Sequence, residues 1–86
     1  MEFEFDENKS KVNKDKHGID FIEAQELWND PDRFEIPTKY LDEPRYVLIA
    51  MINNQHWSAV FTLRNEKIRL ISVRRSRKNE EEIYES

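Results

Sequence analysis

The sequence predicts an α+β fold, in which two N-terminal helices pack on an antiparallel sheet of about four strands and a short C-terminal helix follows. Two segments with helical caps and helix-forming residues stand in the first third of the chain, at about 7–17 and 21–29. Between residues 46 and 75, three strand-like segments follow one another through short polar turns. Strands joined by short turns must be antiparallel, and helices that precede them can cover one face of the sheet.

The first predicted elements are a short strand and a helix. Residues 2–5 alternate Glu and Phe, which is the period of a strand with one buried face. Asp6 is placed to cap the helix at about 7–17. Gly18, the only glycine in the chain, follows Lys16 and His17 and supplies a stop signal.

The second predicted helix, 21–29, has the clearest signature of an amphipathic helix. Asp20 and Glu23 stand at the spacing of a capping box. Phe21, Ala24, Leu27 and Trp28 fall on one apolar stripe at helical spacing, and Asn29-Asp30-Pro31 ends the helix. We expect this stripe, together with Trp57, to contribute to the core.

The remaining predicted elements are strands and a last helix. Residues 33–37 form a possible strand. We expect it at the edge of the sheet, because Pro37 has no N–H to donate to a neighbouring strand. Residues 46–52 are apolar at both parities, so we expect cover on both faces of that strand. Residues 56–64 alternate clearly, 67–75 form the last strand, and the tail that begins at Asn79 contains helix formers.

Length and composition limit the possible classes of protein. The 86 residues suffice for one small domain, 1–86. The chain contains no cysteine, which excludes disulfides, thiolate zinc sites and a cysteine nucleophile. No apolar run approaches the roughly 18 residues of a membrane span, and the N-terminus is acidic, unlike a secretory signal. We therefore expect a cytoplasmic protein that does not bind membranes.

Charge is unevenly distributed along the chain. The net charge of −4 argues against a general, non-specific nucleic-acid binder. Residues 1–44 hold 6 Lys or Arg and 13 Asp or Glu, a balance of −7, whereas residues 45–86 hold 8 and 5, a balance of +3. The positive charge gathers around the last predicted strand, at Arg64, Lys67, Arg69, Arg74, Arg75, Arg77 and Lys78. This asymmetry is typical of a local basic site on an acidic scaffold.

Two functions are open for these cations. Arginines at fixed spacing on a strand can grip phosphate, because each guanidinium offers a planar fork to two oxygens. The alternative is the solvated, charged end of an edge strand, or a docking surface for an acidic partner. The residues alone do not decide between them.

The histidines and the tail add few other candidates. His17, at a helix end, is placed either as a general acid or base or as a cap that serves the helix dipole, whereas we interpret His56 as a turn residue. Two histidines without a carboxylate pattern predict no metal site, and the chain lacks a glycine-rich phosphate loop. Tyr84 can act as a hydroxyl donor or pack the tail helix. We expect no cofactor.

Several segments in series resemble a known family. They are Phe3-Glu4-Phe5-Asp6-Glu7-Asn8-Lys9, Asn13, Lys16-His17-Gly18-Ile19, Phe21-Ile22-Glu23-Ala24, Asn29-Asp30-Pro31, Arg45-Tyr46, Val60-Phe61-Thr62 and Ile68-Arg69-Leu70-Ile71-Ser72-Val73-Arg74-Arg75. From Phe3 to Tyr84 the pattern is similar to the BrnT toxins. The resemblance implies a bacterial type II toxin with a RelE-like ribonuclease fold that cleaves RNA and arrests translation. It also implies a BrnA-type antitoxin partner that blocks the toxin, and contact with operator DNA only through that antitoxin.

Together, the cations and the resemblance lead to a hypothesis of metal-independent endoribonuclease activity. A ribose 2′-hydroxyl would attack the adjacent phosphate while Arg69, Arg74 and Arg75 stabilise its charge and His17 transfers a proton. The expected substrate-binding residues are Arg64, Lys67, Ser72, Arg77 and Lys78. The alternative is a non-catalytic relative that binds RNA or an antitoxin. A DNA-binding regulator is a weaker alternative, because no basic recognition helix is visible.

Overall fold

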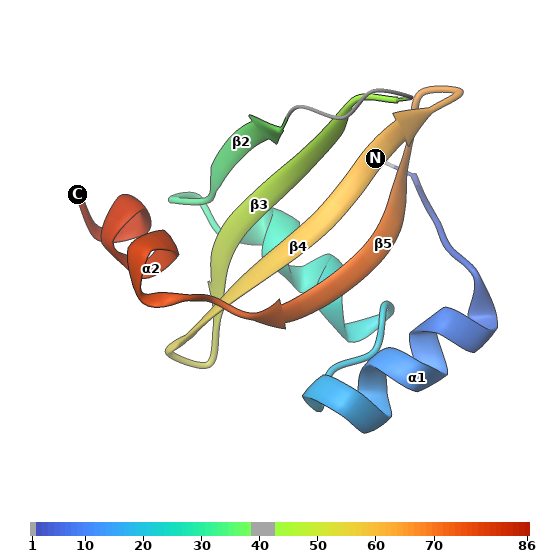
Figure 1. The fold of residues 1–86 in the computed structure, drawn as a ribbon, viewed down its shortest axis with the longest axis horizontal. Coiled ribbons are helices and arrows are strands. Elements are labelled where there is room, and N and C mark those ends of the chain that lie inside the picture. The colour runs from blue at the N-terminus through green and yellow to red at the C-terminus, as the bar shows by residue number, and fades with distance from the viewer. Residues whose placement is uncertain (1, 39–42) are drawn as a thin grey trace.

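In the computed structural model, which describes residues 2–38 and 43–86, five strands form one mixed sheet in the order β1-β5-β4-β3-β2 (Figure 1). In chain order the elements are β1 (Phe3–Glu4), α1 (Glu7–His17), the 3₁₀-helix η1 (Glu23–Asn29), β2 (Phe34–Thr38), β3 (Arg45–Ile52), β4 (Gln55–Arg64), β5 (Lys67–Arg75) and α2 (Lys78–Glu85). No helix in these described ranges is long and apolar enough to cross a membrane.

The predicted fold, two N-terminal helices on an antiparallel sheet of about four strands, is wrong in two respects. First, β1 joins the sheet as a fifth strand and pairs in parallel with β5. The Ile68 N–H donates to the Glu2 carbonyl at 2.9 Å. The other three strand pairs are antiparallel, so the sheet is mixed. Pairing between strands so far apart in sequence is not fixed by a turn, which is why local patterns did not reveal its direction.

Second, the predicted helix 21–29 is a short 3₁₀-helix. The expected capping box does form, since the Glu23 N–H donates to Asp20 Oδ1 at 2.7 Å and the Asp20 N–H donates to Glu23 Oε1 at 2.9 Å. The helical stretch proper has only seven residues. A 3₁₀ run of seven residues is unusual, since most such runs have about three or four. Here it turns Ala24 and Leu27 fully into the core.

Helix α1 has the predicted bounds and caps. The Lys9 N–H donates to Asp6 Oδ1 at 3.0 Å, and Gly18 takes a left-handed conformation with φ of 81°. In that conformation the Gly18 N–H reaches the Lys14 carbonyl at 2.9 Å. Both signals were therefore read correctly from the sequence, and α1 is confirmed over residues 7–17.

Polar side chains, not apolar ones, fasten α1 to the sheet. Asn13 is buried, and its amide nitrogen donates to the carbonyls of Val73 and Ile19, each at 2.8 Å. Its amide oxygen accepts the Val73 N–H at 3.1 Å. Asn13 thus pairs with the edge of β5 as a neighbouring strand would, and satisfies backbone groups that β1 is too short to reach. Val12, the one apolar residue inside α1, is mostly exposed.

One face of the sheet holds the core. Figure 1 shows η1 crossing behind the strands, and its neighbours Ile19 and Phe21 pack there too. The buried cluster contains Ile19, Phe21, Ala24, Leu27, Leu48, Ala50, Trp57, Ala59, Phe61, Ile68, Leu70 and Val73. Trp28 packs against this cluster, with its ring edge-on to Phe3 and Phe61. The predicted core role of Trp28 and Trp57 is confirmed.

The opposite face of the sheet, which we call the open face, is covered by α2 at one end. Glu80 of α2 reaches Ser58 on that face. Tyr84 donates to Asp30 Oδ2 at 2.7 Å, and His56 lies 2.7 Å from Glu85. Tyr84 therefore fastens the tail helix. At the α2 end Ile49 is fully buried, whereas Val47 is only half-buried, so the expected cover on both faces of β3 is complete at one end only.

Candidate nucleic-acid interface

The predicted cations lie at both ends of β5 and do not form one cluster. Arg64 and Lys67 stand opposite each other at the β4–β5 turn, and Arg69 follows opposite Thr62. Arg74 and Arg75 end the strand, and Arg77 and Lys78 lead into α2. Between the two groups run Leu70 to Val73, which contain no charge.

A β-bulge determines which cations share a face. Val60 and Phe61 are consecutive on β4, yet they pair with Ser72 and Leu70, so Ile71 is an extra residue on β5. A bulge resets the alternation of side chains. As a result, Arg69, Ser72 and Arg74 all lie on the open face, whereas simple parity separates Arg69 from the other two. Sequence patterns gave no sign of this extra residue.

Arg75 points the other way and serves packing. It pairs with Trp57, a core residue, and its guanidinium lies 5.4 Å from the centre of the Trp57 ring. A cation over an indole face is a stabilising arrangement. Arg75 remains largely exposed at this edge.

Arg74 is held by a carboxylate of its own chain. Its two terminal nitrogens lie 2.8 and 2.9 Å from the two oxygens of Glu80. Glu80 also accepts from Ser58 Oγ at 3.0 Å and from the Arg77 N–H at 2.8 Å. The hydrogen bonds from Arg74 are the main reason that the pKa of Glu80 falls to about 2, against the opposing effect of burial. Glu80 thus occupies the fork that Arg74 would offer to a phosphate.

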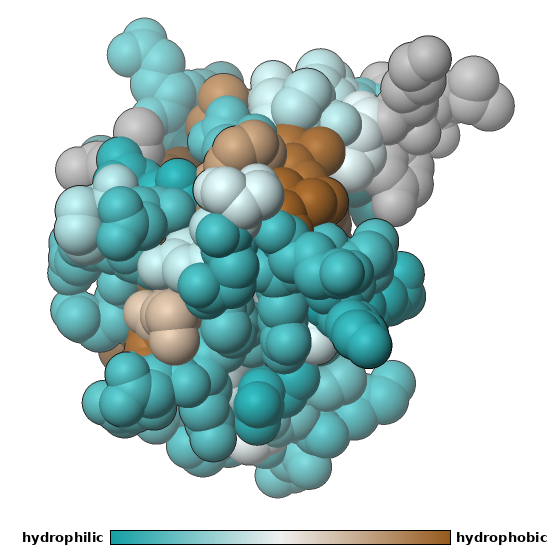
Figure 2. Space-filling model, turned by 90° about the vertical axis from the view of Figure 1, so that its left-hand side faces the viewer, coloured by the Kyte–Doolittle hydropathy of each residue, from teal (hydrophilic) through white to brown (hydrophobic). Residues whose placement is uncertain are grey.

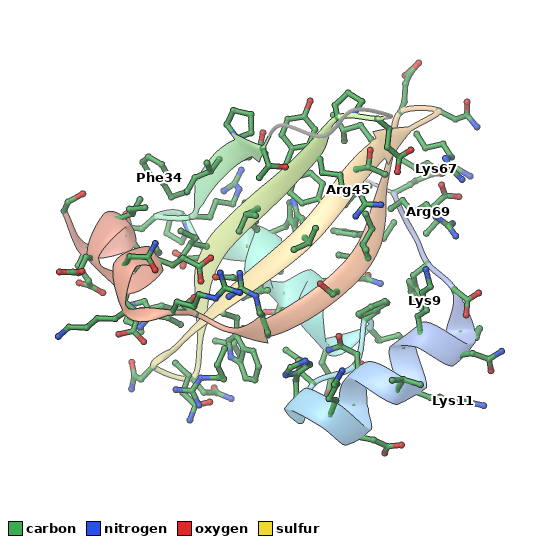
Figure 3. All side chains as sticks on the ribbon, viewed as in Figure 1. Lys9, Lys11, Phe34, Arg45, Lys67 and Arg69 are labelled. Carbon is green, nitrogen blue, oxygen red and sulfur yellow. The ribbon has the colours of Figure 1, made fainter. Side chains whose placement is uncertain are left out.

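Arg64 and Arg69, at the other end of the sheet, are held more loosely than Arg74. The closest ion-pair distances are 3.9 Å from Arg69 to Glu4 and 3.6 Å from Arg64 to Glu43. Arg45, at the start of β3, lies 3.9 Å from Glu43. Figure 3 shows Arg45, Lys67 and Arg69 toward the same end of the sheet. Arg45 was missed as a member of this group because its place beside β4 depends on strand register.

A groove between α1 and β5 contains two of the predicted residues. Its volume is about 300 Å³, and it is lined by Asn8, Lys9, Val12, Asn13, Lys16, His17, Ile71 and Ser72. His17 and Ser72 come from opposite halves of the chain. The groove adds Lys9 and Lys16, which were not among the predicted site residues. Among the described residues, neither lysine has an ion-pair partner, nor does His17.

Helical spacing explains the lysines of the groove. Lys9, Val12, Asn13 and Lys16 follow positions i, i+3, i+4 and i+7, which share one face of a helix. Asn13 turns that face toward β5 by its bonds to Val73. The spacing was visible in the sequence, but without the docking role of Asn13 nothing marked this face as the one beside the strand.

The groove combines groups that suit phosphate chemistry. Two ammonium groups can neutralise a phosphodiester, an imidazole can transfer a proton near neutral pH, and a hydroxyl can donate a hydrogen bond. In the part of the chain that the structure covers, no three His, Asp or Glu side chains are grouped so that they could hold a metal ion.

Comparison with protein families identifies the family of this chain. The family described as "Ribonuclease toxin, BrnT, of type II toxin-antitoxin system" matches residues 5–80. The matched range includes α1, the whole of β5 and Glu80. No curated protein matches the chain.

Proposed function

Because the chain belongs to the BrnT family of ribonuclease toxins of type II toxin–antitoxin systems, we propose that it is a metal-independent endoribonuclease whose reaction centre is the groove between α1 and β5. The family implies an RNA substrate and an antitoxin partner. The observation that carries the location is the meeting of His17 and Ser72 with two lysines that have no ion-pair partner in the described chain.

The proposed reaction is an attack within the RNA strand. The ribose 2′-oxygen forms a bond to the adjacent phosphorus, the bond from phosphorus to the 5′-oxygen breaks, and a 2′,3′-cyclic phosphate remains. His17 accepts the 2′-hydroxyl proton, and the leaving 5′-oxygen takes a proton from solvent. Lys9 and Lys16 stabilise the negative charge that develops on the phosphate oxygens, and Ser72 donates a hydrogen bond to one of them.

The strand arginines extend this site along the RNA. A strand rises about 3.3 Å per residue, and Arg69 and Ser72 lie opposite Thr62 and Val60, so the bulge leaves Arg69 only about 7 Å along the sheet from Ser72. In this proposal Arg69 contacts a phosphate that flanks the scissile one. Arg75, which points to the opposite face beside Trp57, adds only longer-range attraction. Arg74 contacts a phosphate only where that phosphate replaces Glu80. Arg64, Lys67, Arg77 and Lys78 add longer-range attraction, which salt weakens.

The cellular role follows from the same family. We place the single domain, 1–86, in the bacterial cytoplasm, where cleavage of RNA arrests translation until a BrnA-type antitoxin binds the toxin. Operator DNA is contacted only through that antitoxin.

A direct assay of RNA cleavage tests this function. The purified chain is mixed with labelled RNA in the presence of EDTA, and the products are examined for cyclic phosphate ends. We expect cleavage by the wild-type chain, and at least a 100-fold slower reaction for His17→Ala and for Lys16→Ala. Lys11→Ala removes the same charge from α1 outside the groove and is the matched control. Cleavage at the wild-type rate by both groove variants contradicts the proposed location, and loss of cleavage in EDTA contradicts metal independence.

The ion pair between Arg74 and Glu80 favours a second candidate function. Because the chain itself fills that guanidinium, a relative that binds RNA or an antitoxin without cleaving RNA is the alternative. The same assay separates the two: intact RNA that is nevertheless retained on the protein supports the non-catalytic function.

A further inference from the structure

The open face of the sheet carries a row of apolar side chains that α2 does not cover. Ile36, Val47 and Val60 are direct neighbours on β2, β3 and β4. All three are only half-buried in the described structure. Phe34, on the same face of β2, is 47% exposed. Seen from the side of β2 and α2, hydrophobic residues gather in one patch on an otherwise mostly hydrophilic surface (Figure 2).

In the next row along the sheet, the packing of α2 buries the side chains of the open face. Ile49 lies opposite Phe34, and Ser58 opposite Ile49, at the end of the face where α2 packs. Ile49 and Ser58 are both fully buried. The row of Ile36, Val47 and Val60 lies just beyond the part of the open face that α2 covers. An apolar patch with a polar rim is typical of a protein-binding surface.

Cations border the apolar row on its other side. Arg45 and Arg69 lie on the open face one step further along the strands, and Arg64 faces Lys67 beyond them. Glu4 and Glu43 lie 3.9 and 3.6 Å from Arg69 and Arg64. Among the described residues of this rim, four cations (Arg45, Arg64, Lys67 and Arg69) outnumber three carboxylates (Glu4, Glu43 and Glu66), although the whole chain has a net charge of −4. A partner that combines apolar and acidic side chains complements this rim.

We propose that this surface, the row of Ile36, Val47 and Val60 with its rim of Arg45 and Arg69, binds the antitoxin through an apolar segment flanked by carboxylates. The proposal rests on the family's toxin–antitoxin role, which supplies a protein partner. RNA suits the row less well, because aliphatic side chains offer neither charge for phosphates nor aromatic faces for stacked bases.

Binding at this surface also accounts for inhibition of the toxin. Val60 lies directly opposite Ser72, which lines the groove between α1 and β5. Arg69 belongs both to the rim and to the proposed RNA path. An antitoxin segment that covers the row of Ile36, Val47 and Val60 therefore ends beside the groove. It also prevents Arg69 from contacting the RNA. The acidic side chains of the antitoxin compete with phosphate for the same cation.

Variants of the row and the rim test the proposal. The probe is a purified BrnA-type antitoxin, and its affinity is measured by calorimetry. Val47→Asp places a negative charge within the row, and Arg45→Glu reverses the charge of the rim. We expect each to weaken antitoxin binding at least 100-fold, and Val47→Asp, which changes none of the cations, to leave RNA cleavage unchanged. Ile22→Asp, which places the same charge on an exposed apolar residue elsewhere, is the control with unchanged binding.

The outcomes distinguish this surface from the proposed ribonuclease activity. Thermal unfolding of each variant confirms that it is folded, and hydrogen exchange on the wild-type complex gives a second reading: protection of β2 and β3 on binding supports the proposal. Wild-type affinity in Val47→Asp and Arg45→Glu overturns it, as does the absence of binding to the wild-type chain. A chain that binds the antitoxin through this row but leaves RNA intact refutes the ribonuclease activity alone.

Discussion

Glu80 offers the sharpest test of the structure, because its charge is predicted to stabilise the fold strongly. Its side chain is 11% exposed and receives hydrogen bonds from Arg74, Ser58 and the Arg77 backbone. These bonds lower its pKa from 4.5 to about 2, with the bonds from Arg74 contributing most. Each tenfold change in a dissociation constant corresponds to about 1.4 kcal/mol, so the charged form contributes about 3 kcal/mol at neutral pH.

The dependence on pH follows from the direction of this shift. The folded state has the lower pKa, so protonation of Glu80 favours unfolding. Its contribution is therefore complete above about pH 5, decreases to about 1 kcal/mol at pH 3, and is lost near pH 2. Glu80→Gln preserves an acceptor for Ser58 and Arg77 but removes the charge. We expect this variant to be about 2–3 kcal/mol less stable than the wild type at pH 7, and only about 1 kcal/mol less stable at pH 3.

Urea unfolding followed by circular dichroism from pH 7 to pH 3 measures this difference. Glu82→Gln, which removes the charge of an exposed glutamate in the same helix, is the matched control and should track the wild type. A difference between Glu80→Gln and the wild type that stays constant over this pH range would refute the assignment of the pH dependence to Glu80. So would a difference below about 1 kcal/mol at pH 7, since that is typical of an exposed pair.

Three further variants test other parts of the fold by urea unfolding at pH 7. Asn13→Ala leaves the buried N–H and carbonyl of Val73 without partners and should cost about 2–4 kcal/mol; a cost below about 1 kcal/mol would contradict the docking role of this side chain. Tyr84→Phe removes the hydrogen bond to Asp30 and should lower the free energy of unfolding by about 1 kcal/mol. An unchanged free energy of unfolding would show that other contacts hold α2. Asn54→Gly should stabilise the chain by about 0.5–1 kcal/mol, because Asn54 has a φ of 64°; destabilisation would argue against that turn.

Signals within a few residues of each other were read correctly from the sequence. The caps of α1, the capping box of Asp20 and Glu23, and the three hairpin strands depend on neighbouring residues and formed as expected. The position of β1 beside β5 and the bulge at Ile71 depend on pairing across the whole chain. No local pattern encodes such pairing, so the strand count and the shared face of the arginines could not be predicted.

Only part of the candidate site could be predicted, because the rest depends on contacts between distant parts of the chain. His17 and Ser72 were named from chemistry at each position, and the fold brings them to one groove. The contribution of Lys9 and Lys16 depends on how Asn13 docks α1, which is a tertiary contact. The pairing of Arg74 with Glu80 is not visible in the sequence, because it forms only when α2 folds back onto the sheet.

The most direct test of the central claim is to map where RNA binds. A short RNA with a 2′-deoxy nucleotide at the cut site cannot react, because the attacking hydroxyl is absent, and it can be titrated into isotope-labelled protein while NMR chemical shifts are recorded. The groove between α1 and β5 predicts the largest changes at Lys9, Lys16, His17 and Ser72, with smaller changes at Arg69. Changes confined to β2 and β3, with α1 unaffected, would contradict the claim that RNA is cleaved in this groove.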